Sequence, residues 1–231
     1  MTLQRSETAF HVPLGRMAYG RTLDIQRRVH ALRVVGALPD VLLTVEHDPV
    51  FTRGRSARPV EYLVSTEDVA RAAIPVVDVE RGGDVTYHGP GQLVAYPIVD
   101  LRCYGRDVKR YVGMLESAAI GTLRVFGIDA GPRAGFPGVW VREGKIASVG
   151  IYVKDWVTRH GLALNVDVDP AHFGMINPCG LPVRAVSMSD LLARPIGMAE
   201  VEEALVVHLA RLLGRRLERR SLTDLEEQVC A

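Results

Sequence analysis

Apolar residues recur at three- and four-residue spacings in three stretches of the chain, a pattern typical of amphipathic helices. These stretches run from Tyr19 to Gly36, from Arg106 to Phe126 and from Ala199 to Leu213. Gly36 ends the first stretch, and Gly127 directly follows the second, where a glycine cap is expected. The pattern therefore predicts three helices, one near each end of the chain and one in the middle.

Short apolar runs predict the strands. They are Val41–Val45, Val76–Val79, Val139–Val141, Ile146–Val153 and Leu162–Val168. The last three follow one another closely and predict an antiparallel meander. Between Arg81 and Leu101, a turn, a strand, a Gly-Pro-Gly turn and a longer strand indicate a hairpin. Because strands and helices come in blocks, we expect an α+β fold, with a mainly antiparallel sheet and flanking helices, rather than a doubly wound sheet.

Composition narrows the class of protein. The 231 residues include 28 Lys and Arg against 27 Asp and Glu, a net charge of +1 that gives no electrostatic drive to bind nucleic acid. Hydrophobic residues make up 48% and charged residues 24%, as in ordinary globular proteins. No signal peptide and no membrane-spanning run is evident. We therefore expect a single domain over residues 1–231, located in the cytoplasm, with no nucleic-acid or membrane partner.

Three cysteines, Cys103, Cys179 and Cys230, form neither a CxxC pair nor an even set, so disulfides and a cysteine zinc site are not expected. Cys179 lies in Ile176–Pro182, where prolines and a glycine surround a single thiol. Buried and inert is the common state of a cysteine. The prolines and glycine around Cys179 weigh against that state and leave a reactive thiol open, whereas Cys103 and Cys230 are expected to have no function.

A glycine-rich segment, Arg81–Gln92, has the sequence RGGDVTYHGPGQ. Its glycines fit either hairpin turns or a wall against which backbone approaches a substrate closely. No Gly-Lys-Ser/Thr follows, and the spacing differs from that of a dinucleotide fingerprint. The segment is therefore not expected to bind nucleotide phosphates.

Few side chains in the sequence can activate a thiol. Lysine is scarce, and Lys145 follows a Glu-Gly turn at the start of a predicted strand, where alternation places it on one face with Ala147 and Val149. A solvated lysine at a strand end is the ordinary alternative. His47, His88 and His160 are candidates to orient a substrate or exchange a proton. The spacing of the histidines matches no zinc motif, and no GxSxG elbow is present.

Five segments together resemble the octanoyltransferases of lipoate assembly. They are Glu46–Thr52, Arg81–Gln92, Gly144–Gly150, His160–Asn165 and Asn177–Gly180. They occur in the order of that family, and the RGGDVTYHGPGQ string is far more specific than an isolated glycine motif. The resemblance implies the α+β fold shared by biotin and lipoate protein ligases.

The resemblance also implies an activity, the transfer of an octanoyl group from octanoyl-acyl carrier protein to a lysine of a lipoyl domain. The acceptors would be the lipoyl domains of 2-oxoacid dehydrogenase complexes and the glycine cleavage H protein. Cys179 would carry the acyl group as a thioester, with Lys145 as its acid–base partner, and no cofactor or metal would be needed. The implied acyl-substrate residues are Arg81, Gly82, Gly83, Asp84, Val85, Thr86, Tyr87, His88, Ser148, Val149, Gly150, Gly161, Leu162 and Ala163.

Other functions remain open from the residues alone. One alternative is an ATP-dependent lipoate or biotin protein ligase of the same fold, in which Cys179 would be incidental. Another is a noncatalytic protein that binds an acyl carrier domain or a fatty acid. Arginine clusters fit either a dock for an acidic carrier protein or a solvated surface. They are Arg53, Arg55 and Arg58, and Arg211, Arg215, Arg216, Arg219 and Arg220.

Overall fold

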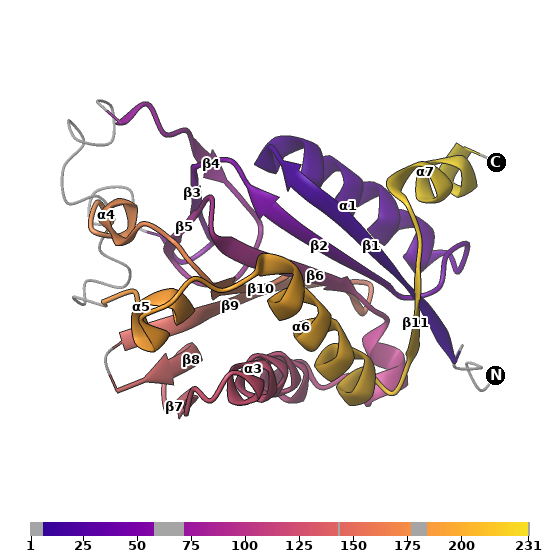
Figure 1. Cartoon of the computed structure of the whole chain (residues 1–231). Coiled ribbons are helices and arrows are strands. Elements are labelled where there is room, and N and C mark those ends of the chain that lie inside the picture. The colour runs from indigo at the N-terminus through magenta and orange to yellow at the C-terminus, as the bar shows by residue number, and fades with distance from the viewer. Residues whose placement is uncertain (1–6, 58–71, 143, 177–183, 231) are drawn as a thin grey trace.

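The computed structural model describes residues 7–57, 72–142, 144–176 and 184–230. Its framework is an eight-stranded mixed sheet (Figure 1). In spatial order the strands are β11 (Arg216–Arg219), β1 (Thr8–Met17), β2 (Val41–His47), β6 (Gln92–Ile98), β10 (Val157–Asn165), β9 (Gly144–Lys154), β8 (Phe136–Val141) and β7 (Gly131–Arg133). A small sheet lies beside it, with the order β4 (Val76–Asp78), β3 (Val50–Arg53) and β5 (Val85–His88).

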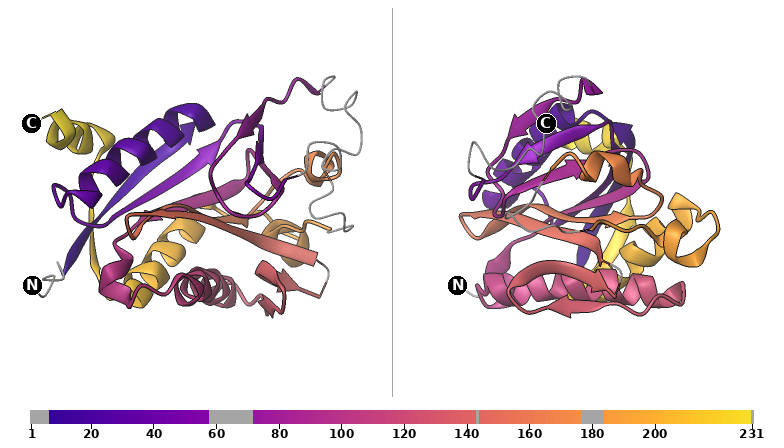
Figure 2. Two further views of the ribbon diagram at one scale, coloured as in Figure 1. Left: turned by 180° about the vertical axis from the view of Figure 1, so that it is seen from behind. Right: turned by 90° about the vertical axis from the view of Figure 1, so that its left-hand side faces the viewer.

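Helices cover both faces of the large sheet, as the views in Figure 2 show. Helices α1 (Tyr19–Val34) and α7 (Leu222–Cys230) lie on one face, and α3 (Val108–Val125) and α6 (Met198–Leu213) lie on the other. The shorter helices are α4 (Pro170–Phe173), α5 (Met188–Leu192) and the 3-10 helix η1 (Leu101–Tyr104). The three helices predicted from periodicity correspond to α1, α3 and α6. In the described part of the chain, no helix is long and apolar enough to cross a membrane.

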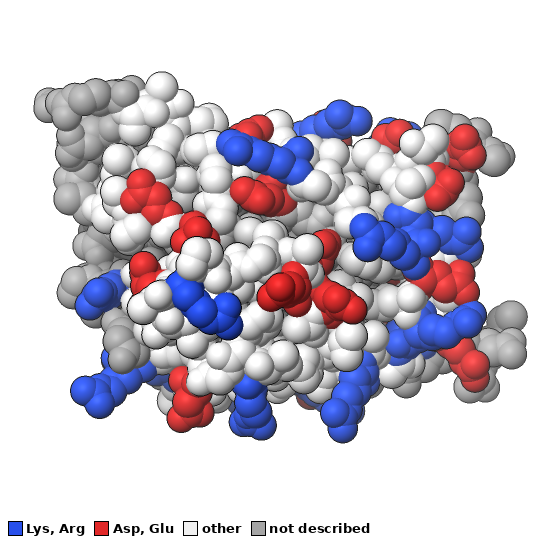
Figure 3. All heavy atoms as spheres, viewed as in Figure 1, with Lys and Arg blue, Asp and Glu red and all other residues white. Residues whose placement is uncertain are grey.

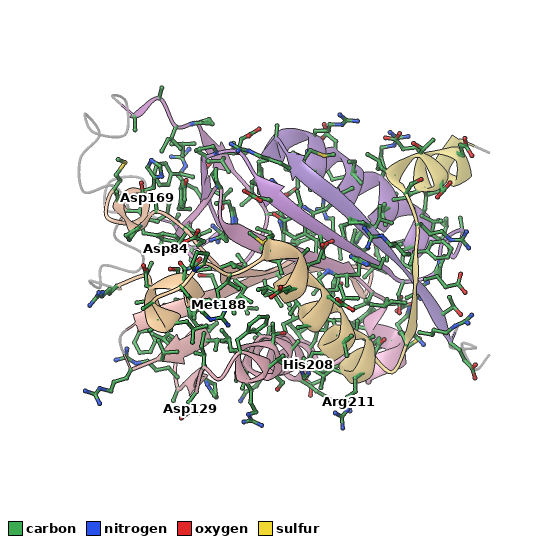
Figure 4. All side chains as sticks on the ribbon, viewed as in Figure 1. Asp84, Asp129, Asp169, Met188, His208 and Arg211 are labelled. Carbon is green, nitrogen blue, oxygen red and sulfur yellow. The ribbon has the colours of Figure 1, made fainter. Side chains whose placement is uncertain are left out.

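The hydrophobic core has a layer on each face of the large sheet. Leu115 of α3 and Leu205 of α6 pack with Leu162 of β10, while Ile25 of α1 packs with Leu43 of β2 on the other face. Gly121 brings α3 and α6 close together, because a Cβ at this position would lie 2.5 Å from Nδ1 of His208. Figure 4 shows His208 on α6 beside α3. The predicted α+β class is confirmed.

The pairing of strands differs from the prediction in one place. Strands β8, β9 and β10 form the predicted antiparallel meander, but β5 and β6 do not form a hairpin. Strand β5 pairs with β3, whereas β6 pairs with β2 and β10. The turn between them is held by long-range contacts: the Gly91 N–H donates to Glu46 Oε1, and the Gly91 carbonyl accepts from Val166 and Asp167.

The ends of the chain add strands that periodicity did not predict. Strand β1 runs parallel to β2 and β11, and α1 provides the crossover from β1 to β2 that a parallel pair requires. A buried carboxylate ties these strands to the C-terminal part of the chain. Asp40 accepts hydrogen bonds from Arg33 Nε at 2.8 Å and from Arg215 Nε and Nη2 at 3.0 and 2.9 Å.

Candidate active site

A cavity of about 540 Å³ lies between the glycine-rich segment and strands β6, β9 and β10. Val94, Val112, Phe136 and Trp140 contribute to an apolar lining. The sequence-predicted residues on its wall are Arg81, Gly82, Gly83, Asp84, Val85, Thr86, His88, Lys145, Ser148, Val149, Gly150, Gly161, Leu162 and Ala163. The fold therefore brings three segments that are far apart in the sequence to one site, although their roles toward a substrate stay predictions.

Tyr87 is the exception among the described residues of this set. It is fully buried beside Phe51, with ring centroids 5.5 Å apart, and also packs against His172 and Phe173. Burial raises the pKa of its hydroxyl to about 12. In β5, Thr86 and His88 line the cavity, whereas Tyr87 packs in an apolar cluster with Phe51, Ile74 and Ile176. The structure thus places Tyr87 in the support of the wall rather than on its surface.

Lys145 is the second residue of β9 and is half-buried on the cavity wall. Its backbone N–H donates to the Arg184 carbonyl at 2.9 Å, and its carbonyl accepts from the Val186 N–H at 3.1 Å. A chain segment that follows Cys179 in the sequence therefore runs beside Lys145 as a parallel bridge to Ala185. Cys179 itself lies outside the described residues, so its pairing with Lys145 stays a prediction.

The glycine-rich segment is organised by Arg81, which is 7% exposed. Its Nη1 donates to the carbonyls of Gly82 and Asp84, and its Nη2 donates to both the carbonyl and the hydroxyl of Thr52. The Gly82 N–H in turn donates to the Ile151 carbonyl at the edge of β9. The interpretation as hairpin turns is wrong, because β5 pairs with β3 while β6 pairs with β2 and β10. Gly83 and Gly91 do adopt positive φ in turns, and the segment forms a wall of the cavity, while its approach to a substrate stays a prediction.

A chain of hydrogen bonds crosses the floor of the cavity. His88 Nδ1 lies 2.7 Å from Gln92 Oε1, Gln92 Nε2 donates to Asn165 Oδ1 at 2.9 Å, and Asn165 Nδ2 donates to the Val186 carbonyl at 3.1 Å. The Val186 carbonyl can only accept, which fixes both amide orientations and makes Nδ1 of His88 the protonated nitrogen. The chain connects β5, β6 and β10 to the segment beside Lys145.

The three candidate histidines are buried and uncharged at neutral pH. His47 Nδ1 donates to the Met17 carbonyl at 2.9 Å, which leaves Nε2 to accept from the Tyr96 hydroxyl at 2.8 Å. Burial lowers the pKa of His47 to about 4 and that of His88 well below its usual value. Burial, together with Arg81 and Arg159, lowers the pKa of His160 to about 3. His88 and His160 line the cavity as neutral imidazoles, whereas His47 lies behind His88, with ring centroids 5.7 Å apart.

This burial predicts an acid-sensitive fold. An unfolded histidine is protonated below about pH 6.5, whereas His47 in the native protein is protonated only below about pH 4. The unfolded state therefore binds more protons between these pH values, and stability falls as the pH falls through this window. We expect the free energy of unfolding to drop by up to about 1.4 kcal/mol per pH unit for each such histidine. Urea unfolding at a series of pH values measures this slope. A profile that stays flat between pH 6.5 and 4 would contradict it.

Sequence reasoning missed several wall residues, among them Tyr19, Phe136, Trp140 and Asn165. Only Trp140 had a usable signal, because it lies in a predicted strand just before the Lys145 turn. For a metal, the described ranges contain no group of three or more His, Cys, Asp or Glu side chains placed to hold an ion.

The two arginine clusters are largely engaged in ion pairs. Arg215 is buried against Asp40, which contradicts both a docking role and a solvated position for this residue. Arg53 pairs with Asp78, and both Arg216 and Arg220 pair with Glu218. Arg58 lies outside the described residues. Figure 3 shows acidic and basic side chains interspersed over the viewed face, and Arg211 points into solvent in Figure 4.

Solved structures with the same architecture share little sequence with this chain. A lipoate-protein ligase A bound with ATP superposes with a TM-score of 0.77 at 17% identity, covering 96% of this chain and 92% of that one. A biotin protein ligase from Aquifex aeolicus superposes with a TM-score of 0.51 at 10% identity, covering 90% and 68%. These likenesses establish the fold and no more.

Sequence relatives are much nearer. An octanoyltransferase from Syntrophobacter fumaroxidans is 47% identical over 219 residues, which are 94% of this chain and 96% of the relative. An octanoyltransferase from Solibacter usitatus is 47% identical over 199 residues, which are 86% and 90% of the two chains. Residues 18–210 match the family described as the lipoyl protein ligase A/B catalytic domain. The chain therefore belongs to the lipoyl protein ligase A/B catalytic domain family, as an acyltransferase akin to the octanoyltransferases.

Proposed function

We propose that this chain, as one catalytic domain over residues 1–231, transfers an octanoyl group from octanoyl-acyl carrier protein to the lysine of a lipoyl domain. The acceptors are the lipoyl domains of 2-oxoacid dehydrogenase complexes and the glycine cleavage H protein. The observation that carries the proposal is the position of Lys145, the one lysine on the wall of a largely apolar cavity among the described residues. Octanoyltransferase relatives over nearly the full length support the same activity.

The reaction divides into two acyl transfers. The Cys179 thiolate attacks the donor thioester carbonyl, the carbon–sulfur bond to the carrier breaks, and the carrier thiol leaves with a proton from Lys145. The acceptor amine then attacks the enzyme thioester, forms the amide and releases the Cys179 thiolate, while Lys145 takes the amine proton and returns to its protonated state. A thioester is already activated, so the chemistry requires neither ATP nor a metal.

The cavity suits the acyl chain. Val149, Leu162 and Ala163 from neighbouring strands give it apolar surface, and burial contributes roughly 0.8 kcal/mol for each methylene removed from water. Backbone N–H groups near Cys179 in the sequence, or in the Arg81–His88 wall, are the candidates to stabilise the tetrahedral oxyanion. The donor carries its chain on a protein, so binding energy from that tail helps to hold the reacting carbonyl in place.

The test is intact-protein mass spectrometry after mixing the enzyme with octanoyl-acyl carrier protein, without ATP and without a lipoyl domain. We expect an octanoyl adduct that hydroxylamine removes, that fragmentation places on Cys179 and that a lipoyl domain discharges. A Cys179→Ala protein is expected to carry no such adduct.

Three outcomes would overturn the mechanism. Octanoyl transfer without any adduct would mean direct attack of the acceptor amine within a ternary complex. Transfer that requires ATP and releases pyrophosphate would mean a ligase reaction, and binding of the carrier without turnover would mean a noncatalytic role.

A further inference from the structure

Strand β8 forms a fitted support for the Lys145 side chain. Gly138 has φ +123°, and a Cβ at this position would lie 2.6 Å from Cε and 3.2 Å from Nζ of Lys145. It would also lie 2.5 Å from the Ala147 carbonyl oxygen, which is backbone and has little freedom to move. Only glycine fits at position 138, because the side chain of any other residue would overlap the stem of Lys145.

Trp140 forms the second part of this support. It pairs in register with Lys145, and its ring centroid lies 5.3 Å from the Lys145 ammonium, within cation–π range. The ring is itself held, because its Nε1–H donates to the Phe136 carbonyl at 3.1 Å and the Arg133 guanidinium lies 5.0 Å from its centroid. The ammonium therefore lies over a fixed aromatic surface.

The backbone at Gly138 is outside the regular ladder. The pairing of β7 with β8 shifts register between Val139 and Phe136, and the pairing of β8 with β9 shifts between Val139 and Trp140. Such irregularities re-aim side chains, and they leave backbone groups that need other partners. The partner here comes from α3, where Glu116 Oε1 accepts the Gly138 N–H at 2.8 Å.

We propose that Glu116 is a positioning residue that holds the Gly138 backbone from α3 and thereby keeps the Lys145 amine in place on the cavity wall. Because glycine has no side chain, α3 holds this turn through the backbone N–H of Gly138, which donates to Glu116. The inference rests on the proposed function for the catalytic importance of Lys145, but the placement of the amine is measurable without any turnover.

The placement test compares Glu116→Ala with Glu116→Gln by trace acetylation and peptide mass spectrometry. The chain has three lysines, so Lys109 and Lys154 serve as internal references within the same sample. We expect Glu116→Ala to change the pH-dependent reactivity of Lys145 several-fold and to leave the two references unchanged. Glu116→Gln keeps an acceptor oxygen at the same position and is expected to match the wild type.

The activity test uses the same variants in octanoyl transfer. We expect Glu116→Ala to lower kcat by roughly tenfold or more with little change in the KM for octanoyl-acyl carrier protein, since small misplacements of a reacting group are costly. Its pH–rate profile should shift, and Glu116→Gln should restore both. Glu203 is an exposed glutamate on helix α6, and Glu203→Ala is the matched control. This substitution is expected to leave kcat unchanged.

Failure of the inference and failure of the proposed function are distinguishable. Unchanged Lys145 acetylation in Glu116→Ala would overturn the positioning role, whatever the activity. If Lys145 acetylation changes as much in Glu116→Gln as in Glu116→Ala, the positioning role is also overturned. The charge of Glu116, rather than its hydrogen bond to Gly138, would then determine the reactivity of Lys145. A Lys145→Met protein with full transfer activity would overturn the proposed mechanism instead.

Discussion

Replacement of Lys145 with methionine is expected to lower octanoyl transfer by about 10²- to 10⁴-fold, the usual contribution of a general acid–base group. Methionine keeps an unbranched stem, so the space beside Gly138 and over Trp140 stays filled while the amine is lost. Both half-reactions should slow, because the same group releases a proton in one and takes it up in the other. Rapid-quench measurement of adduct formation and discharge gives the two rates separately.

The matched control is Lys154→Met. Lys154 ends the same strand, is exposed and does not line the cavity. Its replacement is expected to leave both rates unchanged. A Lys145→Met protein that forms and discharges the adduct at the wild-type rates would show that another group exchanges these protons.

Replacement of Asp40 with alanine is expected to reduce the free energy of unfolding by about 3–5 kcal/mol, the usual cost of removing one partner from a buried ion pair. Asp40 is 3% exposed, and its carboxylate accepts from both Arg33 and Arg215. Without it, Arg215 becomes a buried charge that has lost its carboxylate partner, and the contact between the β1 end of the sheet and α6 loosens. Equilibrium urea unfolding measures the difference.

An exposed ion pair provides the comparison for Asp40. Asp48 pairs with Arg16 at 2.9 Å, and both side chains are 54% exposed. Asp48→Ala is expected to cost less than about 1 kcal/mol, because water screens such pairs. If the two alanine variants unfold at the same urea concentration, the buried network contributes little to stability.

Long-range pairing accounts for the fold features that the sequence did not predict. The Gly-Pro-Gly turn has the local features of a hairpin, yet β5 and β6 belong to different sheets. The deciding contacts are made by the Gly91 backbone to Glu46 and to the chain that follows β10. The parallel strands β1 and β11 were missed for the same reason, since their pairing depends on segments at opposite ends of the chain.

The sequence by itself determined the three long helices and the β8–β10 meander, because periodicity is a local property of the chain, and its motifs pointed to the glycine-rich segment. It also singled out Lys145 and Cys179, since thiol chemistry demands a basic partner. Only the tertiary structure decided that Tyr87 supports the wall from beneath, that Arg215 is buried against Asp40 and that Glu116 reaches Gly138. Each of these features depends on a side chain whose partner is distant in the sequence. The residue type of one partner does not indicate which distant residue it will contact, so the sequence pattern could not predict these contacts.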